Sequence, residues 1–397
     1  MSRDNKLITF ALFLWGAGEG LFFYIQPLYM AQLGATPAEI GAVLALAAFL
    51  TACSFIPGGW LADRYDPKKV MVFGWALGGV AALWMGLAPN WQAFVPAILV
   101  YNLSAYCIPA INSYIVEASE GAPLEHTITL TFAGYAAGSI LAPFVGGQLS
   151  PLIGTQWLYL IGSGFFAISL LTALQVRSHA AHRGAPISIG QQVAHLRPAA
   201  PFFIRMAFVF FALMIGATLP ANYLGELGWT LGDVNTWGGT PQAIGMMVLA
   251  IGLGRLAAGR RRRGLLLGQG LVFMAMVMFM LTTPALRLPG ALGFFLLGGV
   301  SPVRELSNAQ IANQLSHTVR GLALGLNETI FALARAGAAA LAGVLFTLDP
   351  RWPFIVSLAL IPIGLGWVWF SRPIVVREEE IVVMASPGNV VIESVEE

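Results

Sequence analysis

Residues 59–69 read Gly-Trp-Leu-Ala-Asp-Arg-Tyr-Asp-Pro-Lys-Lys, a short polar stretch between two long apolar runs. The two runs, 40–61 and 70–87, are close to the ~20 residues that a helix needs to cross about 30 Å of hydrocarbon. The polar stretch carries two acids and three bases, which are costly to place inside a bilayer. This part of the chain therefore predicts two membrane helices joined by a short loop in water.

The composition of the whole chain is that of a membrane protein. Of the 397 residues, 57% are hydrophobic and only 10% are charged, with a net charge of +2. Soluble domains carry about 25% charged residues. Nothing in this balance suggests a nucleic-acid partner. The first apolar run, 7–30, contains no small-residue cleavage site, so we expect it to remain as a membrane span.

Scanning the chain for apolar runs of this length predicts an all-α integral membrane protein with twelve transmembrane helices. The longest polar break divides them into two sets of six. We expect an N-terminal bundle at 1–176, a central cytoplasmic loop at 177–201, a C-terminal bundle at 202–372 and an acidic tail at 373–397, either disordered or a small hairpin. The predicted spans are 7–30, 40–61, 70–87, 93–116, 128–149, 157–176, 202–224, 237–258, 265–281, 290–311, 322–346 and 352–370.

Lysine and arginine set the expected orientation, because cytoplasmic loops carry an excess of both. With a cytoplasmic N-terminus, sixteen of the 21 basic residues lie on the cytoplasmic side. Only Arg287 and Arg351 lie on the opposite side, and Arg255, Arg304 and Arg335 lie within spans. We therefore expect a multi-pass protein of the inner (plasma) membrane with both termini in the cytoplasm, in agreement with an even number of spans.

Two short stretches recur in the second half of the chain. Residues 59–69 are matched by 254–263 at an offset of 195, and residues 29–34 are matched by 223–228 at an offset of 194. Short motifs that recur at the same places in two sets of six helices indicate a duplicated bundle. Transport folds are built in this way because two similar halves can rock about a central site.

The polar stretch resembles the cytoplasmic loop signature of the major facilitator superfamily. The resemblance implies a transporter that usually works as a monomer. It also implies that Asp63 caps and anchors a helix of the other half, and that Arg64 joins the same charge network. The second copy departs from the pattern at Ala258 and Gly259. The residues that carry the signature are Gly59, Asp63, Arg64, Lys68 and Lys69.

Small residues in the fifth predicted span resemble the glycine-rich antiporter motif of drug-efflux members of this family. They are Gly134, Gly138, Ala142-Pro143 and Gly146-Gly147, with Ala142 where the pattern has glycine. The resemblance implies export. The same residues would equally serve ordinary close packing of helices, with proline bending the helix. Both interpretations stay open.

Five charged residues inside the predicted spans carry the functional hypothesis: Glu19, Arg304, Glu305, Glu328 and Arg335. A charge at the bilayer centre costs at least ~2.5–3.5 kcal/mol, so each is expected to face a cavity and to have a partner. Glu328 and Arg335 share a helix face but lie ~10 Å apart, too far for a direct pair. Arg304 and Glu305 point about 100° apart and are not expected to face the same spot.

Three acids against two arginines leave one carboxylate without a cationic partner, and such a group is suited to loading and releasing a proton. The proton-coupling candidates are Glu19, Glu305 and Glu328, with Glu19 or Glu305 preferred. Arg304 or Arg335 is expected either as a switchable partner or as an anchor for an anionic substrate. A static network of salt bridges between the halves is the alternative.

Other polar residues in the spans are candidates for the substrate cavity. Gln26 lies seven residues after Glu19 and is expected on the same helix face. Asn102, Tyr106 and Ser113 fall along one stripe of the fourth span, and Asn222 lies in the seventh. In the superfamily that the loop resembles, the first, fourth, seventh and tenth spans line the central cavity.

The sequence thus predicts a secondary transporter that exports a small organic solute by alternating access, coupled to protons. A proton-coupled importer of a sugar or organic anion, favoured by the two arginines, and a uniporter stay open. An enzyme is not expected, because the chain lacks an HExxH zinc motif and a GxSxG elbow. Neither a cofactor nor a metal is expected. The expected partners are the substrate, protons and the lipid bilayer.

Overall fold

The computed structural model describes residues 2–119, 124–178, 196–257, 261–314 and 317–371. Most of the predicted central loop and the whole acidic tail lie outside these residues. Within them, every regular element is helical. The elements of the first half are α1 (Arg3–Gly20), η1 (Phe23–Ile25), α2 (Gln26–Gln32), α3 (Pro37–Arg64), α4 (Pro67–Leu87), α5 (Trp91–Leu103), η2 (Ser104–Cys107), α6 (Ile108–Glu117), α7 (Leu124–Ile153) and α8 (Thr155–Ala173).

The described residues of the second half are also helical in every regular element. Its elements are η3 (Arg197–Ala199), α10 (Ala200–Ala217), α11 (Pro220–Glu226), α12 (Leu231–Val234), the π-helical turn η4 (Asn235–Gly239), α13 (Thr240–Ala257), α14 (Arg261–Leu281), α15 (Leu288–Leu297), α16 (Val300–Gln314), α17 (His317–Leu348) and α18 (Trp352–Phe370).

Ten helical segments of the described residues are long and apolar enough to cross a membrane. They correspond to ten of the twelve predicted spans. The predicted spans 237–258 and 290–311 are not among them. The second of these is interrupted at Gly298-Gly299, between α15 and α16, and α16 carries the charged Arg304 and Glu305. The first falls on α13, which follows the π-helical turn η4. Twelve crossings therefore remain a prediction.

Four of the predicted spans are broken inside their length, and the breaks recur along the chain. The first span breaks between α1 and α2, the fourth at η2, the seventh between α10 and α11, and the tenth between α15 and α16. Gln26 and Pro220, which begin α2 and α11, are 194 residues apart, as are Ser104 and Gly298. The offset found in the sequence thus recurs in the backbone.

Proline accounts for three of these breaks. Pro27, Pro109 and Pro220 lie in the first turns of α2, α6 and α11. A proline has no N–H to donate to the preceding turn, and its ring clashes with the carbonyl four residues before it. The same residue is well suited to the first turn of a new helix, where its N–H would have no partner in any case.

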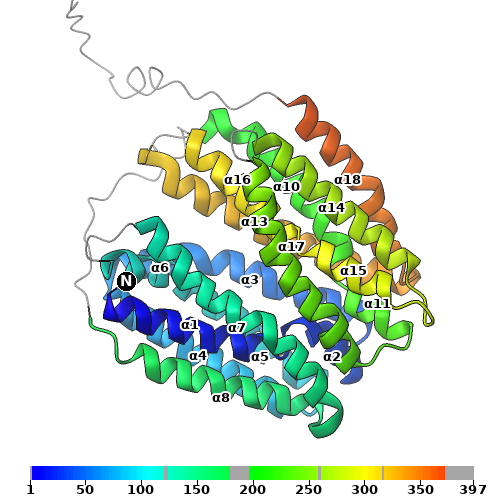
Figure 1. Cartoon of the computed structure of the whole chain (residues 1–397), viewed down its shortest axis with the longest axis horizontal. Coiled ribbons are helices and arrows are strands. Elements are labelled where there is room, and N and C mark those ends of the chain that lie inside the picture. The colour runs from blue at the N-terminus through cyan, green and yellow to red at the C-terminus, as the bar shows by residue number, and fades with distance from the viewer. Residues whose placement is uncertain (1, 120–123, 179–195, 258–260, 315–316, 372–397) are drawn as a thin grey trace, which may run out of the picture.

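Helices of the first half lie on one side of the molecule and those of the second half on the other (Figure 1). In the first half α1 packs along α7 and α8, and α4 packs along α5 and α8. In the second half α10 packs along α17 and α18, and α14 packs along α15 and α18. The two sets meet where α3 packs along α17 and where α7 packs against α12, η4 and α13.

Glycines allow backbone-to-backbone contact where the two sets meet. A Cβ atom added at Gly41 of α3 would lie 2.6 Å from the Cα of Gly343 in α17. A Cβ added at Gly232 of α12 would lie 2.7 Å from the carbonyl oxygen of Gly147 in α7. Real Cβ atoms do not approach this closely, so only glycine permits the contacts. Both contacts join elements from different halves.

Candidate functional site

Glu19 lies at the end of α1, directly before the helix breaks. The hydroxyl of Tyr101 donates a hydrogen bond to Glu19 Oε1 at 2.7 Å, and the hydroxyl of Tyr135 donates one to Oε2, also at 2.7 Å. Tyr101 is on α5 and Tyr135 is on α7. A carboxylate inside a span is tolerated only when its oxygens have partners. Three helices of the first half therefore meet at one hydrogen-bonded carboxyl group.

Aromatic rings hold one of these tyrosines in place. The ring of Tyr101 stacks on Trp15 and Phe166 at centroid distances of 6.4 and 6.2 Å, and Phe22 meets it edge-on at 6.2 Å. Trp15 and Phe166 stack on each other at 3.9 Å. Such ring contacts leave the Tyr101 hydroxyl little freedom to leave Glu19.

Arg335 approaches Glu19 from the second half of the chain. It lies on α17, is half-buried, and is within electrostatic range of both Glu19 and Arg304. In the described part of the chain no ion pair within 4 Å joins Arg335 to an acid. The carboxylate and the guanidinium thus come from different halves of the chain and interact electrostatically without a direct bond.

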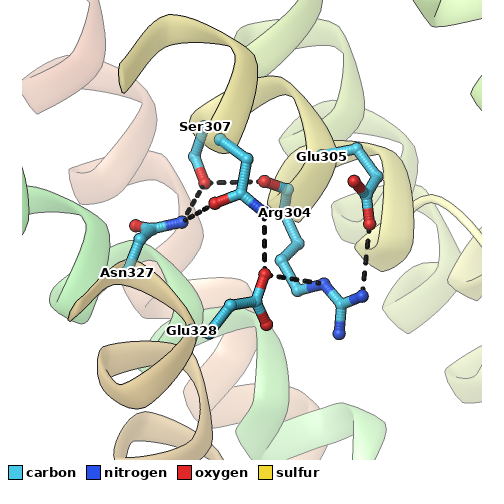
Figure 2. A network of polar contacts seen from close by, with 6 residues as sticks. Arg304, Glu305, Ser307, Asn327 and Glu328 are labelled. Atoms are coloured by element: carbon cyan, nitrogen blue, oxygen red, sulfur yellow. Dashed lines mark hydrogen bonds and ion pairs between the residues drawn. The ribbon is translucent and has the colours of Figure 1, made fainter. Parts of the chain in front are cut away.

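The other charged residues of the predicted spans form a second network on α16 and α17 (Figure 2). Arg304 donates a hydrogen bond to Glu305 at 3.2 Å, and its Nε lies 3.7 Å from Glu328 Oε1. Asn308 Nδ2 donates to the same Glu328 oxygen at 2.7 Å. Asn327 Nδ2 donates at 2.7 Å to both Ser307 Oγ and Asn308 Oδ1. Arg304 therefore has two acidic partners.

This network confirms one geometric prediction and corrects another. Glu328 and Arg335 do not pair, because Glu328 binds Arg304 instead. The prediction that Arg304 and Glu305 would not meet is wrong: the long arginine side chain bends back to the neighbouring carboxylate. The Glu305 side chain is nevertheless 56% exposed, against 28% for Glu328. Of the three acids, Glu19 is the one without an ion pair among the described residues.

The predicted cavity residues of the first and seventh spans have other contacts. Gln26 does not share the helix face of Glu19, because α1 ends at Gly20 and the turn η1 intervenes. Its Nε2 lies 3.9 Å from Met85 Sδ. Asn222, which is buried, donates through Nδ2 to the Pro27 carbonyl at 3.1 Å, so it joins α11 to α2.

The predicted stripe along the fourth span is interrupted by η2. Asn102 donates to the Ile98 carbonyl at 2.9 Å and accepts a hydrogen bond from Thr51 of α3 at 3.3 Å. The hydroxyl of Tyr106 is buried and has no hydrogen-bond partner among the described residues. Ser113, on α6, is half-buried. In the part of the chain that the structure describes, no hydrogen bond or ion pair joins any of these three to Glu19 or Arg335.

Three residues near the site were missed by sequence reasoning: Tyr101, Tyr135 and Asn235. Asn235 of η4 is fully buried, and its Nδ2 donates to the carbonyl of Leu21 at 2.6 Å, directly after α1 ends. In the sequence, a tyrosine within a span is indistinguishable from the rest of the apolar run. Only its position in the structure shows that it binds Glu19. One signal was available for Tyr135, which lies inside the glycine-rich stretch next to Gly134.

The residues of the loop signature surround the turn between α3 and α4. The side chain of Asp63 lies outside the described residues, so its predicted anchoring role stays a prediction. The guanidinium of Arg64 lies 4.5 Å from the centre of the Trp60 ring. The N–H of Lys68 donates to Asp66, which caps α4. Gly59 has open space around it, and Lys69 is exposed.

The glycine-rich stretch of the fifth span packs against α1. A Cβ added at Gly134 would lie 2.6 Å from the Thr9 carbonyl oxygen, and one added at Gly138 would overlap the Phe13 carbonyl. A Cβ added at Gly146 would lie 2.8 Å from both the Leu21 carbonyl oxygen and Asn235 Nδ2. These residues thus pack α7 against the helix that carries Glu19, as the packing interpretation predicts. The antiporter interpretation stays a prediction.

Comparison with known proteins identifies the family to which this sequence is similar. The sequence model of the Major Facilitator Superfamily matches residues 8–303. Multidrug resistance protein 2 of Bacillus subtilis (strain 168) is 22% identical over 386 residues, which cover 91% of this chain and 94% of that protein. Quinolone resistance protein NorA of Staphylococcus aureus (strain MRSA252) is 25% identical over 166 residues, covering 41% of this chain and 42% of that protein.

Solved transporter structures share the fold. The nucleoside transporter NupG superposes with a TM-score of 0.73 at 14% identity, covering 92% of this chain and 98% of that chain. A POT family transporter in complex with a thioalcohol conjugated peptide also superposes with a TM-score of 0.73, at 13% identity, covering 96% of each chain. With ten apolar helices and a family match over most of its length, this multi-pass membrane protein belongs to the Major Facilitator Superfamily.

Proposed function

We propose that this chain is a secondary active transporter that exports a small organic solute in exchange for protons. In this proposal twelve helices form two bundles, 1–176 and 202–372, which rock about a central site and open it to each side in turn. The loop 177–201, the acidic tail 373–397 and both termini are cytoplasmic, and the monomer is the working unit. The names of the two bacterial relatives, multidrug and quinolone resistance proteins, support export.

Glu19 is the proton carrier in this mechanism, and one observation supports it most. Its two oxygens are held by the hydroxyls of Tyr101 and Tyr135, with no ion pair to an arginine among the described residues. A carboxyl group with neutral partners can lose or gain a proton without breaking a salt bridge. Glu305 and Glu328 lack this property, because both contact Arg304.

Arg335 supplies the connection to the second half. With Glu19 charged, the two groups attract each other across the halves; with Glu19 protonated, the attraction is lost. Protonation thereby changes the relative free energy of conformations in which α1 and α17 are close or apart, and coupling requires such a difference. Substrate and proton would compete for the site when the substrate interacts with the charged carboxylate.

A second function is favoured by the same arginine. Because Arg335 has no acidic partner within 4 Å in the described residues, it is available to an anionic substrate. That arrangement would suit a proton-coupled importer of an organic anion. An importer of a sugar would also fit, although binding of a sugar would depend less on the charge of Arg335. Uniport is the simplest variant, in which Glu19 takes no part in transport.

Proton release from the purified protein tests the proposal. Ethidium and the quinolone norfloxacin are added separately to protein in weakly buffered detergent solution containing a pH-sensitive dye, and binding is followed by tryptophan fluorescence. The wild type is expected to release protons as substrate binds. Glu19→Gln is expected to abolish the release, because the amide has no proton to lose at this position.

Glu305→Gln is the matched control, since it changes an intramembrane carboxylate that already has a cationic partner, and it should release protons as the wild type does. Equal release from Glu19→Gln and the wild type would remove Glu19 from the mechanism. Binding without release in all three proteins would contradict proton exchange and favour uniport. Uptake of an organic anion into proteoliposomes, driven by an inward proton gradient, would instead support the importer.

A further inference from the structure

A hollow on the outer surface of the second half lies apart from the charged residues at the centre. It is a shallow, open depression of about 370 Å³ between α14 and α18, lined by Leu266, Leu365, Gly366, Trp369 and Phe370. The side chains of Trp369 and Phe370 are 59% and 84% exposed. In a membrane protein such a surface faces lipid. The hollow therefore offers an apolar groove to the chains of the bilayer.

Two arginines lie at one end of this groove. The guanidinium of Arg262, on the first turn of α14, lies 5.6 Å from the centre of the Trp369 ring. Arg205 of α10 is only 6% exposed and lies near enough to Arg262 for the two charges to repel each other. Within the described ranges neither arginine has an ion pair with an acid. Figure 1 shows α10, α14 and α18 side by side, and each contacts the other two.

The arginine pair indicates what covers the groove. Arg205 is a buried cation without a counter-ion among the described residues, which is unfavourable, and its repulsion by the exposed Arg262 raises the cost further. A negatively charged group between them would remove both penalties. Tryptophan next to arginine at the end of a membrane helix is typical of the headgroup level of a bilayer. The apolar groove and the cationic end therefore match the two parts of one amphipathic anion.

We propose that an anionic phospholipid of the surrounding membrane binds in this groove. The groove is then a lipid-binding site that is separate from the transport site. One acyl chain lies along Leu266, Leu365 and Gly366, and the phosphate lies at Arg262, with Arg205 behind it. Basic groups between membrane helices are known to select anionic headgroups. A zwitterionic lipid offers the same phosphate, but its own ammonium group offsets the charge that the arginines attract.

Native mass spectrometry of the full-length protein in detergent tests the site directly. The protein is mixed with equal amounts of phosphatidylglycerol and phosphatidylethanolamine carrying the same acyl chains, and retained lipids are counted. The wild type is expected to retain phosphatidylglycerol in preference. Arg262→Gln should weaken that retention about fivefold, the effect of one basic residue near a lipid headgroup. Gly366→Leu should weaken the retention of phosphatidylglycerol at least as much, because the leucine side chain fills the groove. A Cβ atom at this position meets nothing within 4 Å, so we expect the variant to fold.

Two control variants match these changes closely. Arg287 also lies 5.6 Å from the centre of a tryptophan ring, that of Trp229, but it is paired with Asp233 at 3.0 Å. Gly164 of α8 is exposed, and a Cβ there also meets nothing within 4 Å. Arg287→Gln and Gly164→Leu should therefore retain phosphatidylglycerol as the wild type does, whether or not the protein transports drugs.

Four results would overturn the proposal. Equal retention of the two lipids by the wild type would show that the arginines do not select charge. Undiminished phosphatidylglycerol on Gly366→Leu would show that no acyl chain lies in the groove. Displacement of the lipid by inorganic phosphate alone would show an anion site without an apolar part. A dimer that is lost in Gly366→Leu would assign the groove to a second copy of the chain instead.

Discussion

The environment of Glu19 shows how single residues determine the geometry of the candidate site. Two hydroxyl groups, from Tyr101 and Tyr135, reach it from different helices, and small residues make this approach possible. Gly138 lies one turn after Tyr135 on α7, at the point where α7 touches the backbone of α1. A bulkier residue there would separate the two helices, and the separation would carry the Tyr135 hydroxyl away from the carboxylate.

Gly138→Ala is therefore expected to lower the free energy of unfolding by about 1–3 kcal/mol, because the added methyl overlaps the Phe13 carbonyl and lies 2.7 Å from the amide nitrogen of Ala17. Thermal unfolding in detergent, followed by tryptophan fluorescence, measures the change. Gly164→Ala on α8 is the matched control. Its methyl enters open space, so its stability should equal that of the wild type or exceed it by up to about 1 kcal/mol. Equal melting of the two variants would contradict the packing account.

Sequence alone could identify the charged residues but not their partners. Glu19 stands out because an acid in an apolar run is rare and costly. Its tyrosines do not stand out, since hydroxyl-bearing rings are common in membrane spans and only the fold brings these two to one carboxyl group. The same holds for Arg304 and Glu305: helix geometry separates their Cβ directions, but the flexible arginine side chain closes the gap.

Discontinuous helices are the main feature at the level of elements. An apolar run predicts that a span exists, and it did so correctly at ten places. Hydropathy carries no information about a break, so the first, fourth, seventh and tenth spans were predicted as continuous. Pro27, Pro109 and Pro220 marked three of the four breaks in the sequence. Treating the first span as one helix caused the wrong placement of Gln26 on the face of Glu19.

The break after α1 frees the carbonyl of Leu21, and two side-chain amides of the second half bind carbonyls at and next to this break. Asn235 donates to the carbonyl of Leu21, and Asn222 donates to that of Pro27. Buried carbonyls without a partner are costly, so these amides hold the segment between α1 and α2 in place. The segment that follows Glu19 is thus held by residues of the opposite half.

Asn235→Leu keeps the approximate shape of the side chain but removes the donor. The Leu21 carbonyl then loses its partner, at a cost of about 1–3 kcal/mol. We expect faster amide hydrogen exchange in residues 21–32, measured by mass spectrometry of the protein in detergent. Asn102→Leu is the control, because among the described residues the Asn102 side chain bonds only within α5 and to α3. Exchange in 21–32 that stays at the wild-type rate in Asn235→Leu would show that the bond does not hold this segment.

At the scale of the whole molecule, the contacts between the halves include backbone-to-backbone packing of glycines. Gly41 meets Gly343, and Gly147 meets Gly232. The repeat in the sequence indicated two related halves, and the repeated breaks agree with it, but no pattern in the sequence could show which helices touch across the halves. In the proposed mechanism of alternating access the halves move relative to each other, so some of these contacts are expected to separate in each cycle.

A reversible covalent bond across the halves tests this requirement. Gln148 of α7 donates a hydrogen bond to Thr236 of η4 at 3.2 Å, so cysteines at these two positions would face each other across the halves. The double variant Gln148→Cys/Thr236→Cys, in a background where Cys53 and Cys107 are alanine, is expected to lose transport of ethidium in proteoliposomes after oxidation and to regain it on reduction.

The control pair lies within one half and has a similar separation. Ser150 and Thr155, on α7 and α8, are 3.0 Å apart through their hydroxyl oxygens. Oxidation of Ser150→Cys/Thr155→Cys should leave transport intact, because these two helices move together in a rigid half. Loss of transport in both pairs would indicate that oxidation damages the protein in general. Continued transport by the oxidised Gln148→Cys/Thr236→Cys protein would mean that α7 and η4 stay together throughout the cycle, so that the moving boundary lies elsewhere in the fold.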